Sequence, residues 1–375
     1  MASLTVNAGN HTRTFCPVSV ALPEEVGAIA LRETETGREV PCQVWKKDDK
    51  VLLSWIVGYL KAGEARTYEI VAGAGAPAEG VALEDTPGDR VDVKIAGDLF
   101  TAYRYGASLA RPHLHPVIGP YRSPITRPLA GPEDKDMDHH HHRSIWVSHG
   151  EVNGVDNWSE MPGHGKTIHR SFEVVESGPV MGRIRACGDW VSEDGEKVLE
   201  EVAEWRFYAQ PASCRAIDLD VVLTATGGDV LFGDTKEGGI ASVRVQPSME
   251  VRNGGQIENS YGGIDEGETW GKQAAWCDYS GEVEGKHMGI AIFDHPDSFR
   301  YPTYWHVRNY GLMTANPFGL SFFKNDPNIR GDYTLGSGEA LSFRYRLYLH
   351  PGDATDGDVG EKYHDFVNPP DVEMT

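Results

Sequence analysis

Short runs in which hydrophobic and polar residues alternate fill the first 75 residues of the chain. The segments TVNAG, VSVAL, KVLLSWIV and RTYEIVAG show this two-residue period or a short β-rich core, and turn residues separate them. A Gly-, Ala- and Pro-rich stretch, AGAGAPAEGVALEDTPGD, follows with the composition of a linker. The pattern predicts a small antiparallel β-sandwich over residues 1–75 and a domain boundary after it.

The strand pattern continues over residues 90–375. Segments such as VDVKIAGDLFTAYRYG, CRAIDLDVVLTATGG and EALSFRYRLYLHPGD alternate, whereas helical periodicity is nearly absent, so we expect no helix longer than two or three turns. So many strands favour a second, large β-sandwich, which makes the predicted fold class all-β. Two long segments between the strands, 106–168 and 253–273, are candidates for functional loops, because long loops in compact domains usually serve function.

Composition narrows the classes of function. The net charge of -21 leaves no basic stripe that could release counterions from nucleic acid, and it disfavours an anionic membrane surface. Five scattered cysteines without CxxC spacing indicate free thiols in a reducing compartment. No signal peptide is visible, and the longest apolar run, VLLSWIVGYL, is too short to span a bilayer. We therefore expect a cytoplasmic protein with no nucleic-acid or membrane partner; the oligomeric state stays open.

The stretch DHHHHRSIWVSHGEVNGVDNW, residues 138–158, holds the densest group of titratable rings. If the run is extended, His139 and His141 face one side and His140 and His142 the other, and His149 follows on the same loop or the next strand. Three interpretations stay open: a metal site formed with nearby carboxylates, acid–base catalysis, and a hydrogen-bonded polar loop. No HExxH motif is present, so the spacing does not choose between them.

Other segments carry further candidates. The turn GDTKEGG places Lys236 and Glu237 between glycines after a buried-looking strand, and the segment 294–319 carries His306 and Arg308 among aromatic residues. In the strand EVAEWRFYA, Glu204 lies on a polar face, which suits either acid–base chemistry or a cross-strand ion pair. Aromatic residues set among polar neighbours, such as Trp158, are what sugar rings require for stacking.

The His stretch resembles the D-H-P-H-H-R-G-x-W motif of the bacterial PmoA-like proteins, and RPHLHPVIGPYRSPITR, GDTKEGG and YRLYLHPGD resemble further blocks of that family. This chain has His140 where the family has Pro, and Ser144 where it has Gly. The family name implies a methane monooxygenase subunit, which is a membrane protein and does not fit a chain without a spanning segment. The resemblance instead implies a supersandwich akin to galactose mutarotases and aldose epimerases. The site residues it implies are His139, His141, His142, Arg143, His149, Lys236, Glu237, His306 and Arg308.

Together these observations predict a carbohydrate-active enzyme that cleaves a glycosidic bond by general acid–base chemistry, as a hydrolase or a lyase. The alternatives are an aldose epimerase, a non-catalytic sugar-binding protein and a metal-dependent oxidoreductase. We expect no required cofactor, although a divalent metal at the histidines is an option, and a mono- or oligosaccharide as the partner. The predicted catalytic residues are His142, His149, Glu204 and Glu237, and the predicted substrate-binding residues are His139, His141, Arg143, Trp158, Lys236, His306 and Arg308.

Overall fold

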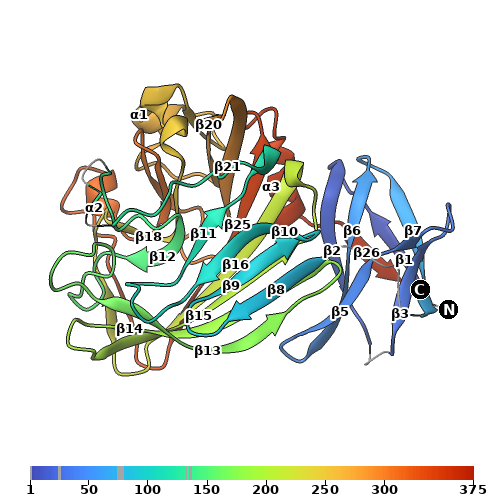
Figure 1. The fold of residues 1–375 in the computed structure, drawn as a ribbon, viewed down its shortest axis with the longest axis horizontal. Helices are drawn as coiled ribbons and strands as arrows, with labels where there is room; N and C mark the ends of the chain where they lie inside the picture. The colour runs from blue at the N-terminus through green and yellow to red at the C-terminus, as the bar shows by residue number, and fades with distance from the viewer. Residues whose placement is uncertain (1, 24–26, 74–79, 132, 135–136) are drawn as a thin grey trace.

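Two β-sandwiches of unequal size make up the molecule, and both termini lie in the smaller one (Figure 1). The computed structural model describes residues 2–23, 27–73, 80–131, 133–134 and 137–375. All strand pairs between the named strands of this part of the chain are antiparallel. The predicted all-β class, a small sandwich followed by a large one, is confirmed.

The small sandwich packs a five-stranded sheet against a three-stranded one. The five-stranded sheet has the order β26 (Asp371–Met374), β1 (Ser3–Asn7), β7 (Ala65–Ala72), β3 (Ile29–Glu33) and β4 (Glu39–Val40). The other has the order β2 (Arg13–Ala21), β6 (Lys50–Leu60) and β5 (Cys42–Lys47). Alternate residues of these strands, such as Leu4, Val6 and Trp55, are buried in its own hydrophobic core, as their two-residue period requires.

The large sandwich packs two eight-stranded sheets face to face. The first, here called the site sheet, has the order β22 (Tyr304–Arg308), β23 (Leu312–Asn316), β18 (Gly238–Arg244), β12 (Ile145–His149), β11 (His113–Val117), β10 (Asp98–Arg104), β9 (Arg90–Ile95) and β8 (Val81–Thr86). The second, here called the back sheet, has the order β13 (Lys166–Glu176), β14 (Met181–Val191), β15 (Lys197–Tyr208), β16 (Arg215–Thr224), β25 (Ala340–Pro351), β21 (Lys286–Asp294), β20 (Trp276–Val283) and β19 (Gln256–Asn259).

A single hydrophobic core fills the space between the two large sheets. It includes Ile145 and Val243 from the site sheet and Trp205 and Leu219 from the back sheet. A two-stranded ribbon of β17 (Val230–Phe232) and β24 (Tyr333–Leu335) stands beside them. The α-helices of the described residues are short, as predicted: α1 (Asp265–Thr269), α2 (Leu320–Phe323) and the nine-residue α3 (Val359–Val367).

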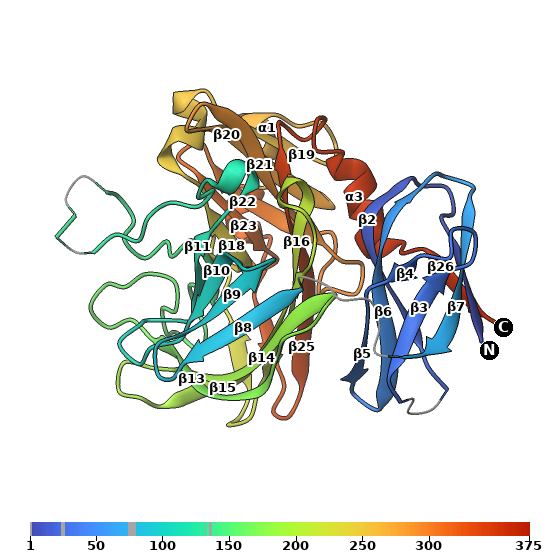
Figure 2. The same cartoon turned by 45° about the vertical axis from the view of Figure 1, so that its right-hand side comes forward.

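The predicted boundaries, 1–75 and 90–375, differ from this arrangement at both ends of the large unit. Strand β8 begins at Val81 and already belongs to the site sheet. At the other end, β26 leaves the large sandwich and pairs with β1, with Leu4 opposite Met374. Figure 2 shows the chain returning past α3 to the small sandwich. The small unit is therefore closed by residues from the end of the chain.

Within the described residues, no helix is long and apolar enough to cross a bilayer. All five cysteines are free thiols.

Candidate active site

A row of side chains crosses four strands of the site sheet on the face that points away from the core. The register places Trp146 of β12 opposite Ser242 of β18, Ser242 opposite Thr314 of β23, and Thr314 opposite His306 of β22. All four are at most 2% exposed, and the hydroxyl groups of Ser242 and Thr314 lie 2.7 Å apart. Loops must cover this face, because a row of polar side chains would otherwise be solvated.

The His run forms part of this cover, and it is a turn, so the alternation of faces that an extended run would give does not apply. The N–H of His142 donates to the carbonyl of His139 at 2.9 Å, and His139 has a φ of 44°. The turn brings the rings of His139, His141 and His142 together, with centroids 4.5–5.8 Å apart. The ring of His140 instead bonds to the carbonyl of Asp134. Three of the four rings therefore form one cluster.

Buried arginines hold the loops in place through main-chain carbonyls. Arg127 donates to the carbonyls of Asp138 and His139, and Arg111 donates to those of Asn157 and Trp158. Both guanidinium groups are almost fully buried, and burial lowers the pKa of each to about 10. These hydrogen bonds to main-chain carbonyls thus fix the positions of the His turn and of Trp158.

His142 is the deepest ring of the turn, and its tautomer is set by its neighbour. Arg244 Nη1 lies 2.9 Å from His142 Nδ1, and a guanidinium can only donate, so Nδ1 accepts and the proton of the neutral ring is on Nε2. Burial and the neighbouring positive charges hold the pKa of His142 well below its usual value. His142 is therefore a neutral donor at neutral pH rather than the acid or base that we predicted.

His306 repeats this arrangement on β22. The indole N–H of Trp270 donates to His306 Nδ1 at 2.9 Å, and an indole nitrogen has no acceptor capacity, so the neutral ring again keeps its proton on Nε2. Burial, with Lys236 and Arg308 nearby, lowers the pKa of His306 to about 3. Two imidazoles on this face are consequently fixed as neutral N–H donors.

Tyr310 joins the His turn to the opposite wall of the site. Its ring stacks on His139 with centroids 4.9 Å apart, and the guanidinium groups of Arg244 and Arg308 lie 4.8 and 5.5 Å from its centroid. Burial raises the pKa of the Tyr310 phenol, the two arginines oppose this, and the charges of Glu237 and Asp138 add to it. Segments 139–143 and 304–310 therefore meet at one place.

The turn that carries Lys236 and Glu237 is held against the same face. Asn316 donates its amide to the carbonyls of Thr235 and Lys236, at 3.0 and 3.2 Å. Lys236 and Glu237 form an ion pair with each other, and their side chains are 36% and 47% exposed. Glu237 is thus a carboxylate near Tyr310 that solvent and a substrate can reach.

Arg143 and Arg308 already have carboxylate partners. Arg143 is paired with Glu160 through two nitrogens, and Arg308 lies 3.1 Å from Glu266 of α1. Trp158 is 2% exposed and packs against Trp146 and His142, with ring centroids 5.4 and 5.5 Å away. Both guanidinium groups are therefore already paired, and Trp158 supports the His turn from within and has no open face.

His149 lies on the other side of the site sheet, which corrects its prediction as a catalytic residue. It lies on the same face of β12 as Ile145 and Val147 and packs against Phe232 and Phe318 in the core. The ring is 0% exposed, its Nε2 donates to the carbonyl of Gly233, and burial lowers its pKa to about 4. No substrate reaches it there.

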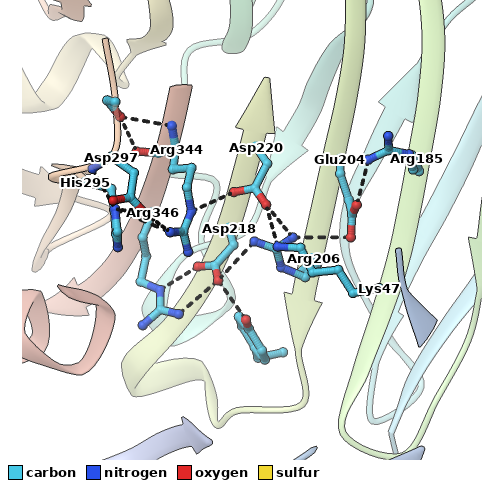
Figure 3. A network of polar contacts seen from close by, with 12 residues as sticks. Lys47, Arg185, Glu204, Arg206, Asp218, Asp220, His295, Asp297, Arg344 and Arg346 are labelled. Atoms are coloured by element: carbon cyan, nitrogen blue, oxygen red, sulfur yellow. Dashed lines mark hydrogen bonds and ion pairs between the residues drawn. The ribbon is translucent and has the colours of Figure 1, made fainter. Parts of the chain in front are cut away.

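Glu204 is the second correction, because it lies on the back sheet. Its carboxylate accepts from Arg183, Arg185 and Arg206 at 3.1–3.4 Å on the outer face of β14 and β15. Figure 3 shows it in a chain of ion pairs that continues through Asp220 to Lys47 of the small sandwich. The cross-strand ion pair, the other interpretation of this residue, is what the structure contains.

The metal-site interpretation of the His run lacks a set of ligands in the part of the chain that the structure describes. Among the residues that the structure describes, no three His, Cys, Asp or Glu side chains are arranged to hold an ion. The rings of His139 and His142 stack nearly parallel, and His142 Nδ1 is already occupied by Arg244. We therefore derive no step through a metal.

Sequence reasoning missed Tyr310 and Arg244, which connect the parts of the site. Arg244 has a detectable signal, because it follows Ser242 by two positions on one strand and so shares its face. Tyr310 lies in a turn between two strands, where no period marks a buried ring. Its role depends on contacts with residues more than 60 positions away.

Comparison with known proteins places the chain in a family. The model of a family of unknown function (DUF6807) matches residues 90–364, nearly three quarters of the chain. The chain belongs to this family. The matched region spans most of the large sandwich and α3. No curated protein matches the chain.

Two solved structures resemble the fold. One is a protein in the glycosyl hydrolase family 38 from Enterococcus faecalis, with 10% identity and a TM-score of 0.51; the match covers 100% of this chain but 47% of that one. The chain thus spans about half the length of that relative. The other is a GalM/aldose epimerase homologue from C. elegans, with 9% identity over 73% of this chain and 100% of that one, at a TM-score of 0.31. At such identities the first likeness concerns the fold alone.

Proposed function

We propose that this protein acts on a carbohydrate at the place where the His turn, Tyr310 and the Lys236–Glu237 turn meet. The observation that carries the proposal is this convergence of imidazole, phenol, guanidinium and carboxylate groups from three distant segments around Tyr310. Aromatic faces and paired donors and acceptors are what sugar rings and hydroxyls require. The fold-level likeness to a protein in a glycosyl hydrolase family is consistent with this substrate class.

The reaction we propose is cleavage of a glycosidic bond with Glu237 as the group that transfers a proton. Glu237 and Asp138 are both exposed carboxylates close to Tyr310, but Asp138 is already bound by Arg127 and Arg244, whereas Glu237 pairs only with Lys236 among the described residues. In hydrolysis, Glu237 would accept a proton from the water that attacks the anomeric carbon, and the leaving oxygen would take up a proton from solvent. His142 and His306 are each 2% exposed, so they hold this face together as neutral donors beneath the substrate.

Two matched substitutions test this assignment, because the chain offers one glutamate at the site and one far from it. Glu237→Gln should reduce turnover by at least ~10²-fold and leave the free energy of unfolding nearly unchanged, since the side chain is exposed. Glu204→Gln should do the opposite: it weakens three buried arginine contacts, costs about 2–4 kcal/mol of stability and leaves turnover unchanged.

The measurements are product detection from a panel of glycosides and oligosaccharides, and urea unfolding of both variants. Normal turnover by the Glu237→Gln protein would rule out the proposed role of this carboxylate. Loss of turnover by a folded Glu204→Gln protein would rule out our placement of the site.

A non-catalytic sugar-binding protein is the second candidate, and one observation favours it. Both buried imidazoles are fixed as neutral donors, and Arg143 and Arg308 are already paired, so most of the cluster is not arranged to transfer protons. In that case Glu237→Gln changes the affinity for sugars, and no product forms with the unsubstituted protein either. An epimerase would instead interconvert free sugars, which the same product analysis detects.

A further inference from the structure

A second depression, separate from the candidate active site, lies where the 260–261 turn and β20 meet the loop before α3. Its volume is about 610 Å³, which is within the usual size of small-ligand sites. Three aromatic residues line it, Tyr261, Trp276 and Tyr363, together with His364 and several polar groups. Figure 2 shows α3 on the side of the large sandwich that faces the small one. Nothing in the proposed reaction uses these residues.

Tyr261 is the feature of this depression that most needs an explanation. It is 76% exposed, and it stands on a turn that is rigidly held. Asn259 is buried, and its side-chain oxygen accepts the N–H groups of Tyr261 and Gly263, each at 3.0 Å. A large aromatic ring that is presented on an ordered turn is typical of a binding surface, because exposure of that area brings no folding stability.

The polar groups of the depression match hydroxyls. Ser260 Oγ accepts the N–H of Ala275 at 2.9 Å, so its own O–H is free to donate. The hydroxyls of Tyr363 and Tyr301 lie 2.7 Å apart, and one of the two is the acceptor. Asp358 is exposed and makes no capping hydrogen bond to α3, so its carboxylate is available as an acceptor. Hydrogen-bond donors and acceptors thus surround the aromatic residues of the depression.

The charge of the lining excludes an anionic ligand. Asp358 and Glu361 both line the depression, and Lys and Arg are absent from its lining. An acidic sugar or a phosphate would be repelled, whereas a neutral sugar ring combines C–H faces for Tyr261 and Trp276 with hydroxyls for the polar groups.

We propose that this depression is a secondary binding site for a neutral saccharide. The proposal goes beyond the active site and depends on the proposed function only for the substrate class. The 261–266 segment connects the two places, since Glu266 pairs with Arg308, and the Cα atoms of Tyr261 and Glu266 are at most about 18 Å apart. A second site at such a distance raises the local concentration of a polymeric substrate.

Native gel electrophoresis through neutral and acidic polysaccharides tests the site. The probes are soluble starch, xylan, glucomannan and, as the acidic member, polygalacturonate. We expect at least one neutral polysaccharide to retard the protein, and Tyr261→Ala to weaken this retardation about fivefold to tenfold in apparent Kd, which is the scale of one lost stacking contact. Tyr59→Ala is the matched control, because Tyr59 is 55% exposed on the small sandwich.

Each outcome decides for or against the proposal. Absence of retardation by every neutral polysaccharide, equal retardation of the Tyr261→Ala protein, or retardation by polygalacturonate alone would each overturn it. The same gels with Glu237→Gln separate the two proposals. Tyr261-dependent retardation by a protein that cleaves no glycoside would defeat the glycosidase and leave this site standing. Turnover of a glycoside without retardation by any neutral polysaccharide would overturn the secondary binding site and leave the glycosidase standing.

Discussion

At the scale of single residues, hydrogen-bond partners decide the chemistry of the histidines more than their number does. Three rings of the His run form one cluster, yet His142 is buried against Arg244 and His139 is exposed against Tyr310. A guanidinium or an indole beside Nδ1 leaves a neutral imidazole only one proton position. The same residue type therefore acts as a fixed donor in one place and remains accessible to solvent in another.

The tautomer of His142 can be measured directly. We expect the ring to stay neutral, with its proton on Nε2, as the pH falls from 8 to 5, because protonation at Nδ1 would place two donors face to face with Arg244. Long-range ¹H–¹⁵N correlation spectra report the state of each ring nitrogen, and His142→Gln assigns the signal. A ring that titrates near pH 6.5 would contradict the arrangement.

The candidate residues in the His run and around 306–308 could be predicted from the sequence, but the faces of two others could not. Alternation on β12 and β15 correctly separates the faces of each strand, and Glu204 does lie on a polar face. This alternation does not show which sheet a strand joins or which face of the strand meets the core. His149 therefore lies on the core side of its strand, and Glu204 lies on the polar face of the back sheet, away from the candidate site.

At the scale of elements, the strands were predictable and their partners were not. The two-residue period marks strands such as β9, whose residues alternate between buried and half-buried. The pairing of β1 with β26 joins residues more than 360 positions apart, and nothing in the four residues DVEM signals it. A local pattern reports the face of a strand, whereas long-range pairing depends on the whole fold.

This closing strand gives a prediction about the small sandwich. Removal of residues 369–375 deletes the β26 partner of β1 and the half-buried Val372 and Met374, which pack on the small core. We expect β1 to become an unprotected edge and the small sandwich to lose a few kcal/mol. Hydrogen exchange of the β1 and β7 amides should then speed up. Glu373→Ala is the control, because this side chain is exposed; unchanged exchange after truncation would refute the prediction.

At the scale of the whole molecule, charged contacts join the two sandwiches. Lys47 of β5 lies 3.5 Å from Asp220 of β16, and Arg13 of β2 is buried with Asp365 of α3 at 3.1 Å (Figure 3 shows the Lys47 end of the network). Asp218 accepts from Arg346 and Tyr208 in the same region, and these contacts hold the pKa of Asp218 and Asp220 below their usual range in spite of burial. The sandwiches are therefore held as one body by ions that stay charged.

Buried histidines should make the protein sensitive to acid. We expect the free energy of unfolding to fall already at pH values above those at which Asp218 and Asp220 take up protons. Four rings that are almost fully buried have lowered pKa values: His113 and His306 at about 3, His149 at about 4, and His142 well below its usual value. Below pH 6.5 the unfolded chain binds a proton at each of them and the folded chain does not, so stability falls as pH falls. The buried Glu201 and Asp294, with pKa values raised to about 7, act in the opposite direction, because the folded chain keeps their protons.

Burial also lowers the pKa values of His115, His141 and His295, to about 4, 3 and 4, so the histidines outnumber the two carboxyls and the unfolded chain binds at least about two more protons than the folded chain. We expect the free energy of unfolding to fall by at least about 3 kcal/mol for each pH unit between pH 6 and 5, from urea titrations at constant ionic strength. His149→Phe should reduce this slope by about 1 kcal/mol per pH unit, because it removes one proton site from the unfolded chain and keeps a ring against Phe232 and Phe318. A stability that is constant or higher at pH 5 would mean that these imidazoles are solvated in the folded protein, and the covered face of the site sheet would then be open.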